Sequence, residues 1–527
     1  MKSLIVSVVA SLFFLHAYAQ QTEILITNAR IIDGTGNSWY WGSLEIAGGM
    51  ITKIQRRRDT DGNTETQRSG IRVIDAKGLI VCPGFIDVHA HIESNIFDRP
   101  TADNYVFDGV TSVVTGNCGS SFNDISEYFR KIDSMKTSIN IASLAGHNTI
   151  RSQAMGMGDR QATPEEMKKM EELMDKAMKD GAVGLSTGLI YLPGTFANTE
   201  EVVNLAKVAA AYGGVYATHM RNEGLKVTDA INEALTIGKQ ANLPVQISHF
   251  KVSGPANWGK STTTLNMIKQ ARLDGYDVTI DQYPYTASST NLATQVPDWA
   301  LDGGLDSLRV KIKDPKTREA IKKEMKANKE EGKNKNFSFA VVAFYAPDTT
   351  LNGLNISEIT KRKGRKVKLM NEAETILEML EKGNAQMVYH SMNEEDVKYF
   401  QAYPFNMPAA DGSVQTGRGV PHPRSYGTEA RFLARYVREM KVTTLEDAIR
   451  RMTSLPAQKF GLKNRGMLKE GMAADILILD ENKVQDMATF EKPHQYSVGI
   501  PYVIVNGKVV IDDGRHTGER SGVALRR

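Results

Sequence analysis

Two histidines one residue apart, His89 and His91, stand at the end of an apolar run that begins at Leu79. The run predicts a buried strand, in which residues i and i+2 project from the same face. Two imidazoles on one face at a strand end can bind one metal ion. The spacing alone fits two structural histidines equally well, so the metal site needs support from elsewhere in the chain.

A cysteine and two more histidines supply candidate ligands. Cys118 follows the apolar run 113–117, and a thiolate there would be a strong zinc ligand. Its alternatives are a small buried apolar residue and a disulfide with Cys82, the only other cysteine. His219 and His249 each end a β-branched run and lie 30 residues apart, about one βα unit. Adjacent parallel strands would bring both rings to the same rim.

A carboxylate near the end of the last predicted strand, Asp411, can bind metal and exchange protons with a water molecule. The alternative is a turn aspartate before Gly412. Taken with the four histidines and Cys118, Asp411 makes hydrolysis at a metal centre the chemistry that these residue types favour.

The elements that must position these residues alternate between strands and amphipathic helices, the pattern of a parallel α/β barrel. Helices are expected over residues 164–179, 199–212 and 444–451. Nine candidate strands compete for eight places, so one, which we take as 387–391, is expected to be accessory. Short alternating strands at both chain ends predict one small β-sandwich. The expected division is a sandwich of residues 20–82 and 460–527 and a catalytic barrel of residues 83–459.

Residues 297–368 interrupt the barrel pattern and are dense in lysine and glutamate. We expect an insertion there. A lid over the catalytic face is one role for it, because lids are long insertions on that face. A solvated helical region without such a role is the other.

Composition narrows the class of protein. With 527 residues, 41% hydrophobic and 24% charged, the chain has the make-up of a globular enzyme. A net charge of +4 without a basic, aromatic patch argues against a nucleic-acid partner. Lys2, the apolar run 4–15 and the Ala-x-Ala pattern ending at Ala19 predict a signal peptide over residues 1–19, too short for a membrane span. We therefore expect an exported protein, periplasmic or secreted. The sequence does not indicate its oligomeric state.

Together these residues resemble the D-aminoacylase branch of the amidohydrolase superfamily, the N-acyl-D-amino acid deacylases. The resemblance runs from about Thr22 to Val510. It is most specific in residues 83–91, 116–119, 184–194, 216–223, 247–253, 281–286 and 407–412. It implies a metal-dependent (β/α)8 TIM barrel with a small β-sandwich built from both chain ends.

The resemblance also implies a ligand set. In that branch a cysteine and two later histidines hold one zinc ion tightly, and Cys118, His219 and His249 match them. A second, often weakly filled metal position has its own three ligands, one of which is the catalytic general acid/base. The matching residues here are His89, His91 and, as the acid/base, Asp411.

Substrate contacts follow in the same way. Lys251 and Arg424 match the cations that bind the substrate's α-carboxylate in the branch, and otherwise they are solvated surface charges. Strand alternation also directs Lys251 to the same side as His249, two residues earlier. Tyr191 and Tyr283 match tyrosines of the substrate pocket.

The partner implied is a small molecule with a free carboxylate. One departure bears on substrate class: residues 92–94 read Ile-Glu-Ser where many members of the branch are acidic.

The function that follows is a zinc-dependent hydrolase that cleaves the amide bond of N-acyl-D-amino acids. A periplasmic dipeptidase for L-Xaa-D-Xaa substrates would use the same machinery. Another amidase or cyclic-amide hydrolase, or a non-catalytic scaffold of the same fold, are further alternatives. A scaffold usually loses metal ligands, whereas all six candidates are present here.

Overall fold

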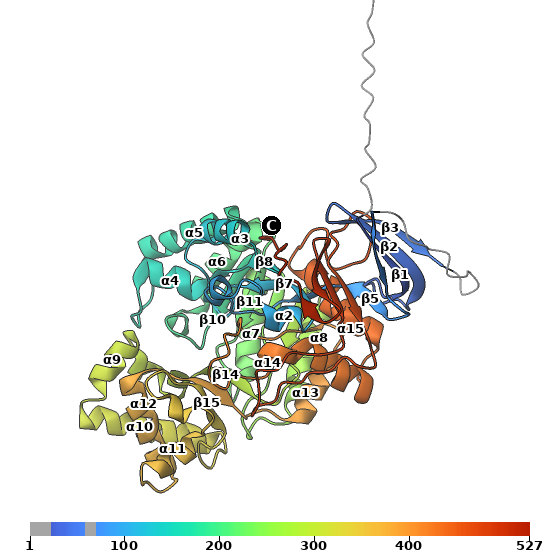
Figure 1. The fold of residues 1–527 in the computed structure, drawn as a ribbon. Coiled ribbons are helices and arrows are strands. Elements are labelled where there is room, and N and C mark those ends of the chain that lie inside the picture. Colours follow the sequence, from blue (N-terminus) through green and yellow to red (C-terminus); the bar gives the residue numbers. More distant parts are fainter. Residues whose placement is uncertain (1–22, 58–69) are drawn as a thin grey trace, which may run out of the picture.

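The computed structural model describes residues 23–57 and 70–527, and Figure 1 shows the fold. The predicted signal peptide, residues 1–19, lies outside the described residues. Among the described residues, no helix is both long enough and apolar enough to cross a membrane.

Strands from both ends of the chain join in one nine-stranded sheet. β5 and β18 connect the two ends by antiparallel pairing, with Cys82 opposite Leu477. Ile26, Leu44 and Ile476 are fully buried in the core under this sheet. The boundaries of the predicted sandwich domain stay predictions. The strands are β1 (Ile24–Ile31), β2 (Tyr40–Ala47), β3 (Met50–Arg56), β4 (Arg72–Asp75), β5 (Ile80–Pro83), β18 (Ile476–Leu479), β19 (Tyr502–Val505), β20 (Lys508–Asp512) and β21 (Arg515–His516).

Parallel strands in the middle of the chain form two sheets, with the strand orders β6-β7-β8 and β9-β10-β11-β12-β13-β17. Only Leu144 separates β8 from β9, and a parallel bridge joins Ala90 to Gly412 beyond β6 and β17. Both connections are those a closed barrel needs, although closure itself stays a prediction. The strands are β6 (Phe85–Asp87), β7 (Val110–Thr115), β8 (Asn140–Ser143), β9 (Ala145–Gly146), β10 (Gly184–Gly188), β11 (Val215–His219), β12 (Val245–Ile247), β13 (Val278–Gln282) and β17 (Asn406–Pro408).

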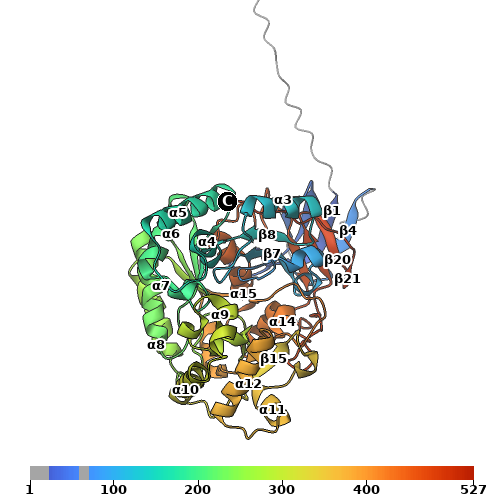
Figure 2. The same ribbon diagram turned by 90° about the vertical axis from the view of Figure 1, so that its left-hand side faces the viewer.

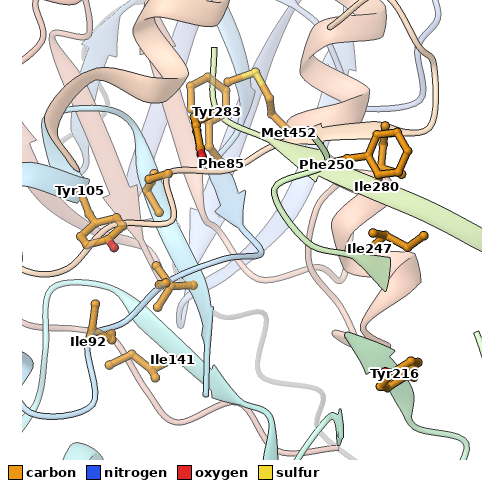
Figure 3. Packing of buried hydrophobic residues seen from close by; sticks show 14 of the residues in the cluster. Phe85, Ile92, Tyr105, Ile141, Tyr216, Ile247, Phe250, Ile280, Tyr283 and Met452 are labelled. Carbon is orange, nitrogen blue, oxygen red and sulfur yellow. The ribbon is translucent and has the colours of Figure 1, made fainter. Parts of the chain in front are cut away.

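Helices follow most of these strands, and Figure 2 shows α5 to α8 running along one side of the molecule. α5 begins where expected because Thr163 caps it, forms a capping box with Glu166 in the first turn, and is followed by Pro164 at the first helical position. Buried side chains from strands and helices meet in the core, among them Phe85, Tyr216 and Met452 (Figure 3). The helices around the parallel strands are α1 (Asn95–Asp98), α2 (Asp103–Val106), α3 (Ile125–Met135), α4 (His147–Met155), α5 (Pro164–Lys179), α6 (Thr199–Ala211), α7 (Val227–Ala241), α8 (Ser261–Leu273), α13 (Glu394–Gln401), α14 (Arg424–Arg431), α15 (Leu445–Met452) and α16 (Ser454–Lys459).

An insertion with its own hydrophobic core separates β13 from β17 and projects from the body of the molecule (Figure 1). Its three-stranded sheet has the order β14-β16-β15. β16 covers most of the strand expected to be accessory. The predicted bounds, 297–368, cover only the middle of this segment, since its sheet begins at Ser288 and ends at Tyr389. Its elements are β14 (Ser288–Asn291), α9 (Gly304–Lys311), α10 (Pro315–Glu331), β15 (Ala340–Phe344), α11 (Ile356–Arg362), α12 (Leu369–Lys382) and β16 (Gln386–Tyr389).

Candidate metal centre

The six residues expected to bind metal lie at or just beyond the carboxyl ends of parallel strands. Because parallel strands that lie side by side end on the same side, residues far apart in sequence meet there. His89 and His91 follow β6, Cys118 follows β7, and Asp411 follows β17. His249 follows β12 in the same way. His219 is the last residue of β11.

The Cys118 thiol lies between two of these histidines. Its Sγ is 3.6 Å from Nδ1 of His219 and 3.6 Å from Nε2 of His249. Zinc bonds of about 2.3 Å to sulfur and about 2.0–2.1 Å to nitrogen, at a tetrahedral angle, separate the two donor atoms by about 3.5 Å. One thiolate and two imidazoles at this spacing therefore fit a zinc ion and leave a fourth coordination position open.

The second predicted position adjoins the first. Nε2 of His89 lies 3.3 Å from Cys118 Sγ and 3.5 Å from Oδ1 of Asp411. Nε2 of His91 lies 3.1 Å from the same Asp411 oxygen. One atom each of His89, His91 and Cys118 fall within 4.8 Å of one another, as do those of His89, His249 and Asp411. The two positions are thus neighbours, with Cys118 in reach of both.

The backbone is strained where three of these side chains leave their strands. Cys118, His249 and Asp411 have φ of 51°, 35° and 48°, in the left-handed region that non-glycine residues avoid. All three are buried. Gly119, the residue after Cys118, has φ of 78°, and a Cβ there would lie 2.1 Å from Oδ1 of Asn148. The surrounding structure therefore holds conformations that redirect the side chains toward the centre.

Two carboxylates that the sequence did not single out contact the candidate ligands. Oδ1 of Asp281 accepts the backbone N–H of His249 at 2.7 Å and lies 3.2 Å from Nδ1 of His89. Oε1 of Glu223 lies 2.8 Å from Nδ1 of His249. Partners of this kind fix the ring and the tautomer of a metal-binding histidine. Both acids fall within the stretches of most specific family resemblance, 216–223 and 281–286, which is the signal that could have found them.

Burial sets the charge states. Burial raises the pKa of the Cys118 thiol well above its ordinary value, so a thiolate there requires a bound cation. Burial lowers the pKa of His219 and that of His249 well below the ordinary value, which leaves both rings in the neutral form that binds metal. Burial acts to raise the pKa of Asp411, but the charge of Arg424 and the nearby histidines outweigh it and hold that pKa well below its usual range. Asp411 is ionised at neutral pH, as a base must be.

Arg424, predicted to bind the substrate's carboxylate, lines the cavity and pairs with Asp411. Its Nη2 is 2.9 Å from Oδ2 of Asp411 and donates to the carbonyl of Ser289 at 3.3 Å. Its Nη1 is buried and has no hydrogen-bond partner among the described residues. Tyr283 packs against it, with the guanidinium carbon 4.4 Å from the ring centroid, and the buried Tyr283 hydroxyl also lacks a partner within the described chain.

The other two predicted substrate residues differ in placement. Tyr191 lines the cavity next to the centre, with its hydroxyl 3.0 Å from Oγ1 of Thr290. Lys251 does not line it: its side chain is 1% exposed, and its Nζ lies 2.6 Å from Glu223 and 2.7 Å from Nδ1 of His249. Strand alternation is not the reason for this position, because β12 ends at Ile247, before the left-handed His249.

A cavity of about 930 Å³ lies beside the metal centre. Cys118, Asp411 and Arg424 contribute to its lining, and the insertion forms one wall with residues such as Phe344. The centre thus faces a space large enough for a small organic substrate. Both cysteines are free thiols, which removes the disulfide alternative for Cys82 and Cys118.

Comparison with known proteins defines the class. The model of the amidohydrolase family matches residues 72–511, and the chain belongs to this family. Within it, the chain is similar to "D-aminoacylase" of Alcaligenes xylosoxydans xylosoxydans, 32% identical over 97% of this chain and 98% of that protein. It is also similar to "N-acyl-D-glutamate deacylase" of the same organism, 33% identical over 96% and 97%. The resemblance drawn from the sequence is confirmed.

Solved structures agree. A crystal structure of D-aminoacylase has a TM-score of 0.81 and 32% identity, over 96% of this chain and all of that one. A structure of N-acyl-D-glutamate deacylase from Bordetella bronchiseptica, complexed with zinc and a phosphonate inhibitor that mimics the tetrahedral intermediate, has a TM-score of 0.80 and 32% identity over the same shares. The expected amidohydrolase fold is confirmed.

Proposed function

We propose that the protein is a zinc-dependent hydrolase that cleaves the amide bond of N-acyl-D-amino acids, releasing a carboxylate and a free D-amino acid. Cys118, His219 and His249 would hold the zinc ion, with room for a second, weaker site at His89, His91 and Asp411. The relatives support the D configuration, because they are D-aminoacylase, N-acyl-D-glutamate deacylase and, from the same organism, "N-acyl-D-aspartate deacylase", 32% identical over 96% of this chain and 95% of that protein.

One observation carries the proposal: the candidate base and the candidate carboxylate anchor touch. Asp411 and Arg424 are 2.9 Å apart. In an N-acyl amino acid the scissile amide nitrogen is only two bonds from the carboxylate carbon. A site that binds the carboxylate at Arg424 therefore presents the scissile bond to Asp411. A substrate with a remote carboxylate would not need this contact.

The residues then have distinct tasks. When bound, zinc polarises the scissile carbonyl and lowers the pKa of water from about 15.7 toward about 7. Asp411 accepts a proton from the attacking water and delivers it to the departing nitrogen, which leaves only when protonated. Nη1 of Arg424 and the hydroxyl of Tyr283, which have no hydrogen-bond partner among the described residues, donate to the α-carboxylate. Glu223 and Asp281 hold His249 and His89 in orientation.

A substrate panel tests the proposal. We expect the zinc-loaded protein to hydrolyse N-acetyl-D-amino acids, and to discriminate against the L enantiomers and against N-acetyl-D-amino acid amides, which lack the carboxylate charge. Arg424→Ala should lower kcat/KM for free acids by about 10- to 100-fold, the worth of one charge-assisted hydrogen bond. Amidated substrates should be little affected by this change. Equal hydrolysis of free acids and amides by the wild type would refute the carboxylate anchor, and L-Xaa-D-Xaa dipeptides in the same panel test the dipeptidase alternative.

We also propose that residues 1–19 are an export signal and that the mature enzyme acts in the periplasm or outside the cell. The support is the charged start, the apolar run and the Ala-x-Ala pattern. Terminal sequencing of the exported protein should find Gln20 or a close neighbour as the first residue. An intact Met1 on exported, active protein would contradict cleavage.

A further inference from the structure

One positively charged side chain that lines the cavity has no role in the mechanism proposed above. Arg418 lines the cavity and is exposed. Within residues 23–57 and 70–527 it has no hydrogen bond, ion pair or aromatic partner. The other arginine of the lining, Arg424, is paired with Asp411. Arg418 therefore presents an uncompensated positive charge to whatever occupies the cavity.

The loop that carries Arg418 is fixed against the insertion. The backbone N–H of Val420 donates to the carbonyl of Ala343 in β15 at 2.8 Å. Nε2 of His494 donates to the carbonyl of Gly419 at 3.0 Å. Gly419 has φ of 68°, and a Cβ there would lie 2.5 Å from the Ala343 oxygen, so only glycine permits this contact. Each of the two residues after Arg418 is therefore held by a hydrogen bond, which keeps Arg418 at the cavity wall.

Arg418 and Arg424 line the same cavity and come from one short stretch of the chain. Arg418 lies on the segment between β17 and α14, and Arg424, six residues later, is the first residue of α14. Arg424 contacts the carbonyl of Ser289 in β14, and the loop of Arg418 contacts Ala343 in β15, of the same three-stranded sheet. When Arg424 binds the α-carboxylate of a substrate, the substrate's side chain, which is bonded to the adjacent Cα, also lies near Arg424. Its acyl group lies beyond the scissile bond, on the side of the metal centre.

Overall sequence identity does not indicate which amino-acid side chain the substrate carries. The D-aminoacylase, the D-glutamate deacylase and the D-aspartate deacylase are 32%, 33% and 32% identical to this chain. Resting on the function proposed above, we infer that Arg418 binds a second carboxylate, on the side chain of the D-amino acid. The preferred substrates are then N-acyl derivatives of acidic D-amino acids.

Paired substrates of equal shape test this inference. For N-acetyl-D-glutamate and N-acetyl-D-glutamine we expect the wild type to favour the acid in kcat/KM by about 10-fold or more, the effect of one hydrogen bond between charged groups. Arg418→Gln should reduce that acid-to-amide ratio by about 10-fold, and Arg418→Lys should retain part of it. The control is Arg520→Gln, another exposed arginine without an ionic partner among the described residues and outside the cavity, which should leave the ratio unchanged.

Two results would overturn the inference: a wild type that prefers the D-glutamine substrate, or an unchanged ratio in Arg418→Gln. In either case hydrolysis of neutral N-acetyl-D-amino acids would leave the proposed function standing. Failure to hydrolyse any N-acyl-D-amino acid with zinc bound would instead refute the proposed function itself.

Discussion

Replacing Glu223 by glutamine should weaken zinc binding without changing a zinc ligand. Oε1 of the carboxylate lies 2.8 Å from Nδ1 of His249 and accepts from Nζ of the buried Lys251 at 2.6 Å. Outer hydrogen bonds of this kind are typically worth 10- to 100-fold in metal affinity, or about 1.4–2.7 kcal/mol. For Glu223→Gln we expect a loss of zinc affinity near the upper end of this range, about 100-fold. Nζ of Lys251 already lies 2.7 Å from the same Nδ1, and without the Glu223 charge to compete for that atom Lys251 is its donor. That bond forces the tautomer in which Nε2 carries the proton and cannot bind metal.

The assay is competition of each purified variant with a zinc chelator, alongside thermal unfolding of the metal-free proteins to show that the fold is retained. Glu233→Gln is a matched control, since Glu233 is also largely buried (14% exposed, against 12% for Glu223) and pairs with Arg221 at 2.9 Å. The control should bind zinc within about twofold of wild type, because no ligand contacts Glu233. Unchanged zinc affinity in Glu223→Gln would refute the assignment of Nε2 of His249 as a ligand oriented by Glu223.

Two further changes test the centre directly. Cys118→Ala should abolish tight zinc binding, because Sγ is the atom that lies within 3.3–3.6 Å of three histidines; metal analysis after dialysis that finds zinc undiminished would remove Cys118 from the site. In the same analysis His89→Ala should lose less zinc than His219→Ala if the second position is the weaker one, and equal loss would indicate one coupled centre. Asp411→Asn should lower kcat by about 10²- to 10⁴-fold with zinc retained, as expected for loss of a general acid/base; near-normal turnover would exclude Asp411 from proton transfer.

The parts of the fold that follow from local pattern could be predicted from the sequence. The helix expected over 164–179 is α5 (Pro164–Lys179), because a capping box and an apolar stripe are both local signals. The meeting of Cys118, His219 and His249 could also be predicted from the sequence, because parallel strands share one carboxyl edge and each residue follows an apolar run.

Features that depend on contacts between distant residues and leave no pattern in the sequence could not be predicted. The extent of the sheet in the insertion, from Ser288 to Tyr389, could not be predicted, because it depends on the pairing of β14 with β16 across about a hundred residues. Glu223 has no local sign of its role, since an acid just beyond a strand is usually a surface charge. Alternation gives no valid direction for Lys251, because that rule fails where the backbone turns left-handed at His249.

Left-handed residues follow several of the strands at this centre, and buried carboxyl groups hold the backbone there. The centre is therefore defined by these acids as well as by the candidate ligands. A left-handed residue costs about 1–3 kcal/mol, so it persists only where its surroundings hold it. Asp281 binds both the backbone of His249 and the ring of His89. Asp87 accepts the backbone N–H of His89 at 2.9 Å and that of Ala410, next to Asp411, at 3.1 Å. Two buried acids thus tie together the exits of β6, β12, β13 and β17, and the donor spacing that fits zinc is set by the protein's own hydrogen bonds.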